Sequence, residues 1–355
     1  MCPQLQHLAW SSANGWEHSR QFLSPHLVSI SFWLSVNDHR ADFGLDSAIS
    51  SLPTTRLETL SLAGDVPWTA YIQPALSEVV QRLNTCFKRI DAWSSLSDAA
   101  WGHLASLPKL ESLYLVDTPS IEVLKSISHE PTFPALEHMV LELRDYYYQH
   151  LPVLFSLLKS TSLKEVTIRG SRRVRPVALP SEVAIAMRKT ELHRSITVLV
   201  FTGFYPADLT FVSHLRSFSS LETLECDTRC QELQCVFPLT DSDIEQLARG
   251  LPRLVTLRLG HPCNFSNPNT TIKSMISLST HCPSLDTLCL PCNLTNIYED
   301  VRMESGEPDP RLETRSSCAL RVLAFNWMIR PESIEALGIM KSALRHLFPH
   351  WLRST

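Results

Sequence analysis

Residues 239–260, LTDSDIEQLARGLPRLVTLRLG, contain a predicted helix followed directly by a predicted strand. Thr240 and the acidic residues after it supply side chains that cap a helix N-terminus, and apolar residues then recur at the three-and-four spacing of a helix face. Gly250 and Pro252 are expected to end this helix, because both residue types are common at helix C-termini. The phrase Leu254-x-x-Leu257-x-Leu259 comes next, and its alternation predicts a short strand with its leucines buried.

The same apolar phrase recurs along the whole chain. Its twelve copies begin at Leu5, Leu27, Leu57, Phe87, Leu110, Leu136, Leu163, Ile196, Leu221, Leu254, Leu285 and Leu320. Successive starts lie 22 to 35 residues apart, which is enough for one strand and one helix. A period of this length is typical of a solenoid, in which each unit buries its apolar face against its neighbours.

Proline supports the repeat independently of leucine. In six copies a proline stands two residues before the first apolar position, at Pro3, Pro25, Pro108, Pro134, Pro252 and Pro283. Proline cannot continue a helix and favours an extended residue before it, so it separates the helix of one unit from the strand of the next. The segments predicted as helices are residues 70–83, 97–107, 148–159, 207–218, 240–251, 272–280 and 332–340. The alternative is an ordinary α/β domain with a buried parallel sheet, but no glycine-rich turn of the kind that often follows its strands is present.

Composition narrows the classes of partner. The chain has 355 residues, a net charge of −4 and 19% charged residues, so it lacks the basic surface that nucleic acid or an anionic membrane would attract. No apolar run reaches the ~20 residues of a membrane helix, and the N-terminus does not resemble a signal peptide. We expect a cytoplasmic or nuclear protein whose ten cysteines are free thiols, with no nucleic-acid or membrane partner.

Residues 239–260 and the stretch HCPSLDTLCLPCN at 281–293 resemble the leucine-rich repeats of F-box proteins, especially the fungal group with degenerate repeats. The resemblance runs from Cys2 to about Phe348. It implies an α/β fold, a right-handed, curved leucine-rich-repeat solenoid with parallel strands on the concave face and helices outside. We expect residues 1–355 to form a single solenoid of about 12 irregular repeats, with a polar loop insertion at 294–317.

The resemblance also implies a function, the binding of a protein substrate for an SCF-type ubiquitin ligase. The F-box that would dock the ligase core is missing, because the first residues already lie within a repeat. Residues 179–183, LPSEV, are similar to the beginning of an F-box, but we interpret them as the start of a helix. Either the chain is a fragment of a longer protein, or its first repeat is covered by another segment or partner, and we favour the fragment. The ligase core would be a partner only if an F-box lay upstream. A second hypothesis is a scaffold or regulatory leucine-rich-repeat protein unconnected with ubiquitin ligase. A third is an extracellular receptor fragment, which the sequons at Asn264, Asn269 and Asn293 would permit.

A protein partner is expected on the concave face, where the residues between the buried leucines point. Those positions carry Ser29, Ser31, Trp33, Thr59, Ser61, Arg89, Asp91, Trp93, Ser112, Tyr114, His138, Glu142, Glu165, Arg169, Glu225, Asp227 and Arg258. The candidate partner-binding residues are Arg89, Asp91, Trp93, Tyr114, His138 and Glu142. The first four lie on adjacent predicted strands and are expected to form one patch. Aromatic and arginine residues such as these are common anchors of protein interfaces. The alternative is that they are ordinary solvated side chains.

No set of residues predicts catalysis, a metal or a cofactor. Cys289 and Cys292 have a spacing seen in zinc sites, but Leu290 should face the core, which would turn Cys289 the other way. No nucleophile elbow, metalloprotease motif or phosphate-binding glycine loop is present. The basic cluster from Arg169 to Arg175 is interpreted as a solvated loop. We therefore expect a binding protein and not an enzyme.

Overall fold

The computed structural model describes residues 4–11, 16–34, 44–64, 72–127, 132–143, 149–170, 179–204, 206–228, 237–260, 268–293, 320 and 322–324. All structural statements below refer to these residues. The chain divides into two compact units, Met1–Val174 and Arg175–Thr355, and each is described by itself.

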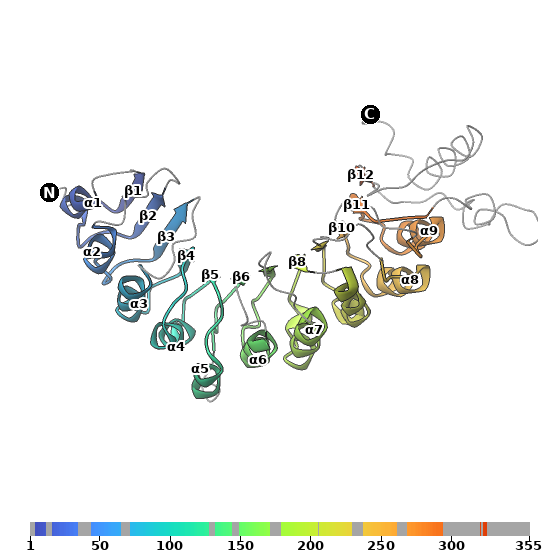
Figure 1. Ribbon diagram of the computed structural model, residues 1–355, viewed down its shortest axis with the longest axis horizontal. Helices are drawn as coiled ribbons and strands as arrows, with labels where there is room; N and C mark the ends of the chain where they lie inside the picture. The colour runs from blue at the N-terminus through green and yellow to red at the C-terminus, as the bar shows by residue number, and fades with distance from the viewer. Residues whose placement is uncertain are drawn as a thin grey trace, which may run out of the picture. The chain divides into compact units, whose positions relative to one another are not determined.

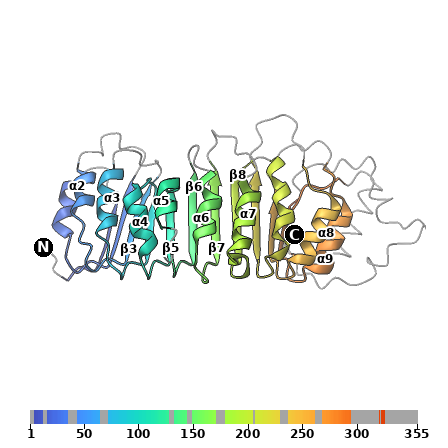
Figure 2. The same ribbon diagram turned by 90° about the horizontal axis from the view of Figure 1, so that it is seen from below.

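The first unit contains a parallel sheet whose strands pair in chain order. Its strands are β1 (His7–Ser11), β2 (Ser29–Leu34), β3 (Thr59–Gly64), β4 (Arg89–Ala92), β5 (Ser112–Val116), β6 (His138–Leu143) and β7 (Glu165–Gly170). The helices between them are α1 (Trp16–Ser19), the 3-10 helix η1 (Arg20–Phe22), α2 (Leu45–Ser50), α3 (Gln73–Gln81), α4 (Asp98–Ser106), α5 (Ile121–Ser126) and α6 (Leu151–Leu157). Figures 1 and 2 show α2 to α6 side by side on one face of this sheet.

The second unit repeats the arrangement. Its strands β8 (Val198–Phe204), β9 (Thr223–Thr228), β10 (Thr256–Leu259), β11 (Thr287–Cys289) and β12 (Val322–Ala324) are again parallel and in chain order. The helices are α7 (Leu179–Lys189), the 3-10 helices η4 (Leu192–Arg194) and η5 (Pro206–Ser217), α8 (Asp241–Gly250) and α9 (Ile272–His281). Each unit therefore has the predicted α/β architecture of a leucine-rich-repeat solenoid, with parallel strands in one layer and helices in the other.

The leucine phrases determine where the strands form. Each of the twelve strands begins two residues after the start of a phrase, so its second residue is the second apolar residue of that phrase. These residues align across the sheet: Leu60 pairs with Ile90, which pairs with Leu113, and Leu257 pairs with Leu288. All five are fully buried. Successive repeats thus share one apolar interior within each unit, as the period predicts.

Local capping explains several helix starts. The Ser97 and Ser120 hydroxyls accept hydrogen bonds from backbone N–H groups in the first turns of α4 and α5. At α8 the Thr240 side chain accepts from the Asp243 N–H, and the Asp243 carboxylate accepts from the Thr240 N–H, which completes a capping box. The capping side chain predicted at Thr240 is therefore confirmed, and Ser97 caps the helix that was predicted to begin there.

Two predicted helices differ in detail. Residues 206–217 form a 3-10 helix, and the buried residues Leu209, Val212 and Leu215 recur at every third position, which fits its three residues per turn. Gly250 is the last residue of α8, as predicted. Its φ is not positive, so a left-handed backbone is not the reason for a glycine at this position. A Cβ atom there would lie 2.6 Å from the carbonyl oxygen of Arg216, so the glycine allows close contact between α8 and η5. The expected helix at 332–340 and the loop insertion at 294–317 lie outside the described residues.

Candidate functional site

The strand face of the first unit, opposite the helices, carries rows of side chains that alternate with the buried leucines. One row is His7, Ser29, Thr59, Arg89, Ser112, His138 and Glu165, and the next is Ala9, Ser31, Ser61, Asp91, Tyr114, Val140 and Thr167. A third row includes Ser11, Trp33 and Ala63 on β1 to β3 and Val116, Glu142 and Arg169 on β5 to β7. Small side chains prevail on β2 and β3 apart from Trp33, whereas charged and aromatic side chains gather on β4 to β7.

Arg89 and Asp91 lie on the same face of β4, two residues apart. The Arg89 Nη2 atom is 3.9 Å from Asp91 Oδ2, so this ion pair is long, and the side chains are 58% and 22% exposed. The other carboxylate oxygen, Oδ1, is shielded from solvent and has no hydrogen-bond partner. Burial raises the pKa of Asp91, and the opposing effects of Arg89 and Arg169 are smaller. Asp91 is thus a carboxylate with unused hydrogen-bonding capacity on the strand face.

Tyr114 is at the centre of a cluster that joins four strands. Its ring stacks with that of Trp93, which follows β4, at a centroid distance of 5.8 Å and an interplanar angle of 19°. The Arg169 guanidinium lies over the same ring, 5.7 Å from the centroid, and donates a hydrogen bond of 3.2 Å to the Tyr114 hydroxyl. That hydroxyl donates in turn to Glu142 Oε2 at 3.4 Å. The tyrosine therefore links side chains from β4, β6 and β7 into one surface.

The protonation of Tyr114 is fixed at neutral pH. Burial is the largest cause and raises the pKa of Tyr114 to about 12, although the nearby Arg169 lowers it. The phenol consequently keeps its proton and can donate to Glu142. The Tyr114 phenol therefore stays in one hydrogen-bonding state over the physiological pH range.

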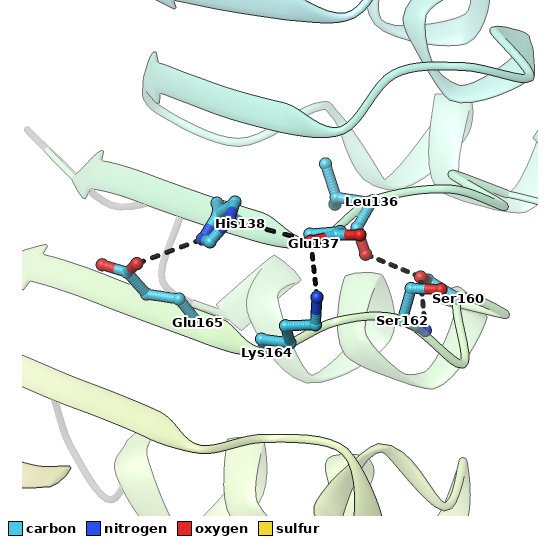
Figure 3. A network of polar contacts seen from close by, with 7 residues as sticks. All are labelled: Leu136, Glu137, His138, Ser160, Ser162, Lys164 and Glu165. Atoms are coloured by element: carbon cyan, nitrogen blue, oxygen red, sulfur yellow. Dashed lines mark hydrogen bonds and ion pairs between the residues drawn. The ribbon is translucent and has the colours of Figure 1, made fainter.

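His138 belongs to a second network next to this cluster (Figure 3). Its Nδ1 atom lies 3.1 Å from Glu165 Oε2 on β7, and its Nε2 atom lies 3.9 Å from Glu137 Oε2. Lys164 Nζ donates to the same Glu137 oxygen at 2.7 Å, and this hydrogen bond is the main reason that the pKa of Glu137 is lowered. The buried Ser160 hydroxyl donates a hydrogen bond of 2.7 Å to the backbone carbonyl of Leu136. This hydrogen bond holds the turn before β6. His138 therefore lies between two carboxylates, Glu137 immediately before β6 and Glu165 at the start of β7.

The structure brings together most of the residues that the sequence singled out. Arg89, Asp91, Trp93 and Tyr114 form the expected patch, and Glu142 joins it through the Tyr114 hydroxyl. The contact of Arg169 with Tyr114 was missed, although Arg169 was assigned to the correct face. These two residues are 55 positions apart, and no local pattern predicts that an arginine side chain reaches across two strands.

The second unit differs on its strand face. Arg258 Nε lies 3.7 Å from Glu225 Oε1 there, and none of the strand-face residues whose side chains the structure describes is aromatic. Leu290 is buried and Cys289 is partly exposed, as the strand alternation predicted. The described residues contain no group of three or more potential metal ligands. None of the helices in the described ranges has the length and apolarity needed to cross a membrane.

No model of a known protein family matches this chain, and no curated protein matches it. It is similar to a chain in the crystal structure of the Rad7 and Elc1 complex in yeast, with 16% sequence identity and a TM-score of 0.49. That similarity covers 93% of this chain and 79% of the yeast chain.

Proposed function

We propose that this chain is a protein-recognition module that binds a partner on the strand face of its first unit. The observation that carries the proposal is the cluster of Arg89, Asp91, Trp93 and Tyr114 on the face that the helices leave uncovered. We call this cluster, together with Glu142 and Arg169, the strand-face cluster. Tryptophan, tyrosine and arginine supply most of the binding energy in protein interfaces, usually from a small central group of residues.

The geometry of the cluster favours binding over a purely structural role. Its charged groups use little of their hydrogen-bonding capacity on one another: the closest contact of Arg89 with a carboxylate is 3.9 Å, and Arg169 has no ion pair among the described residues. The strands beneath are parallel and paired, so the side chains start from fixed positions and lose less conformational freedom on binding. The half-buried Trp93–Tyr114 pair offers apolar area beside these open polar groups.

The more specific proposal is that the module binds substrates for an SCF-type ubiquitin ligase. It rests on the resemblance of residues 239–260 and 281–293 to the repeats of F-box proteins. In such proteins a separate F-box docks the ligase core, so the repeats of this chain would contribute the substrate-binding part. The alternative is a scaffold or regulatory leucine-rich-repeat protein with no connection to ubiquitin ligase.

Site-specific photo-crosslinking tests the recognition surface. A crosslinking amino acid replaces Ser112, which is level with Arg89 and His138 on the strand face, or Glu78, which is exposed on α3. In cell extract we expect a discrete crosslinked protein at position 112, none of the same mass at position 78, and loss of the product when Trp93→Ala is added. Equal products at both positions would contradict the proposal. Co-purification of a cullin and its linker subunit with the crosslinked partner would favour the ligase role over the scaffold.

A further inference from the structure

The strand-face cluster lies beside a strip of small side chains. On β2 and β3 this strip consists of Ser31, Ser61 and Ala63. Trp33 stands on one side of Ala63, its register partner on β3, and is 50% exposed. On the other side the Trp93 N–H bonds to the Leu62 carbonyl at 3.4 Å, which brings Trp93 level with Ala63. Since neighbouring strands are ~4.8 Å apart, the two tryptophan backbones are roughly 10 Å apart, with Ser61 and Ala63 of β3 running between them.

Asp91 lies at the edge of the same strip. It is the register partner of Ser61, and its carboxylate has one shielded oxygen without a donor and one that Arg89 reaches only at 3.9 Å. A buried or half-buried carboxylate normally has closer donors, so this acid lacks the partner that its surroundings call for. Burial disfavours the charged form of Asp91 and raises its pKa, and a cation placed against the carboxylate would offset that cost.

The balance of open charges also favours a cationic ligand. A further carboxylate of the strand-face cluster, Glu142 on β6, accepts a hydrogen bond from the Tyr114 hydroxyl at 3.4 Å and has no ion pair within the described part of the chain. Of the two arginines, Arg169 is held against the Tyr114 ring and hydroxyl and is therefore less available to an anion. Aromatic rings beside a carboxylate attract ammonium and guanidinium groups through the ring quadrupole as well as the charge.

We propose that the strip between Trp33 and Trp93 binds an extended segment of a partner protein that places a lysine or arginine side chain against Asp91. This inference rests on the proposed recognition function and adds the chemistry of the partner. The segment lies across β2 to β4, with its small or apolar residues over Ser61 and Ala63. Its basic side chain contacts the exposed Asp91 oxygen and the edge of the Trp93–Tyr114 stack.

Peptide pools test the proposal with the full chain. Four immobilised pools of nine-residue peptides have random flanks and a central arginine, lysine, glutamate or leucine. We expect the arginine and lysine pools to retain about tenfold more of the chain than the glutamate pool, as one well-placed charge contact provides. Asp91→Asn should lower that ratio to about threefold or less, and Trp33→Ala should weaken retention on the basic pools. Asp227→Asn is the matched control on the strand face of the second unit and should leave the ratio unchanged.

Each other outcome overturns the proposal. Preference for the glutamate pool would assign the strip to an acidic partner through Arg89 and Arg169. If Asp91→Asn still preferred the basic pools, the basic side chain would bind at a residue other than Asp91. Equal retention of the four pools, or no retention at all, would remove the basic extended segment as the ligand. In all these cases a crosslink at position 112 would still support the recognition surface, whereas loss of that crosslink alone would contradict the proposed function.

Discussion

Trp93 stacks on Tyr114 with ring centroids 5.8 Å apart, although one residue follows β4 and the other is in the middle of β5. The contact arises because the parallel register sets Asp91 beside Tyr114 and leaves Trp93 one step beyond Ala92. The two stacked rings form a continuous aromatic surface on the strand face.

Gly250→Ala and Gly102→Ala form a matched pair of helix substitutions. A Cβ at residue 250 would lie 2.6 Å from the Arg216 carbonyl oxygen, whereas at residue 102 its nearest neighbour is the Ile127 Cγ2 atom at 4.0 Å. We expect Gly250→Ala to lower the free energy of unfolding by about 1–3 kcal/mol, as overpacking does. Gly102→Ala should raise it by about 0.5–1 kcal/mol through helix propensity. Urea denaturation measures both, and equal effects would disprove the close contact of α8 with η5.

Asp241→Ala should destabilise the second unit. The Asp241 carboxylate accepts hydrogen bonds from the backbone N–H and the hydroxyl of both Thr271 and Ser274, and so connects α8 to the start of α9. Because Ser274 is fully buried, its donors would lose their partner without gaining water, at a cost of about 1–3 kcal/mol. The exposed neighbour Ser242→Ala serves as the control and should change stability by less than about 0.5 kcal/mol. Chemical denaturation distinguishes the two, and a wild-type midpoint for Asp241→Ala would rule out this role.

Ionisation of Tyr114 should lower the stability of the fold at high pH. Its pKa is raised to about 12 in the folded chain, above the ordinary value of 10.0. The folded state therefore holds this proton more tightly than the unfolded state, and its stabilising effect is lost as pH rises from about 10 to about 12. The free energy of unfolding should fall more steeply in the wild type than in Tyr114→Phe over this range. Parallel curves for the two proteins would contradict the assigned environment.

Asp91→Asn should be tolerated by the fold. The pKa of Asp91 is raised because burial disfavours its charged form, so ionisation at neutral pH costs stability. Replacing the carboxylate with an amide removes that cost, and the variant should unfold at the same or a higher temperature than the wild type at pH 7. The advantage should disappear in acid, where the wild-type side chain is also neutral. A lower Tm at pH 7 would show that Asp91 stabilises the fold through Arg89 after all.

The sequence predicted the fold well because its determinants are local. Phrases such as Leu110-x-x-Leu113-x-Leu115 set the position and the face of each strand, and the acceptors at Ser97 and Thr240 set helix starts, all within a few residues. It predicted a helix over residues 207–218, and residues 206–217 form one of 3-10 geometry. The spacing of the apolar residues does not distinguish the two helix types, because the buried residues Phe211, Leu215 and Phe218 also fit an α-helix.

By itself, the sequence determined the alternation of strand and helix and which side chains leave the core, because both follow from spacing along the chain. It also predicted that Arg89, Asp91, Trp93 and Tyr114 would lie together, since adjacent strands in register bring equivalent positions to one place. Tertiary structure alone decided that Arg169 covers the Tyr114 ring and that Asp91 Oδ1 has no partner. Those contacts depend on how long side chains settle between strands that are distant in sequence, which no local pattern specifies.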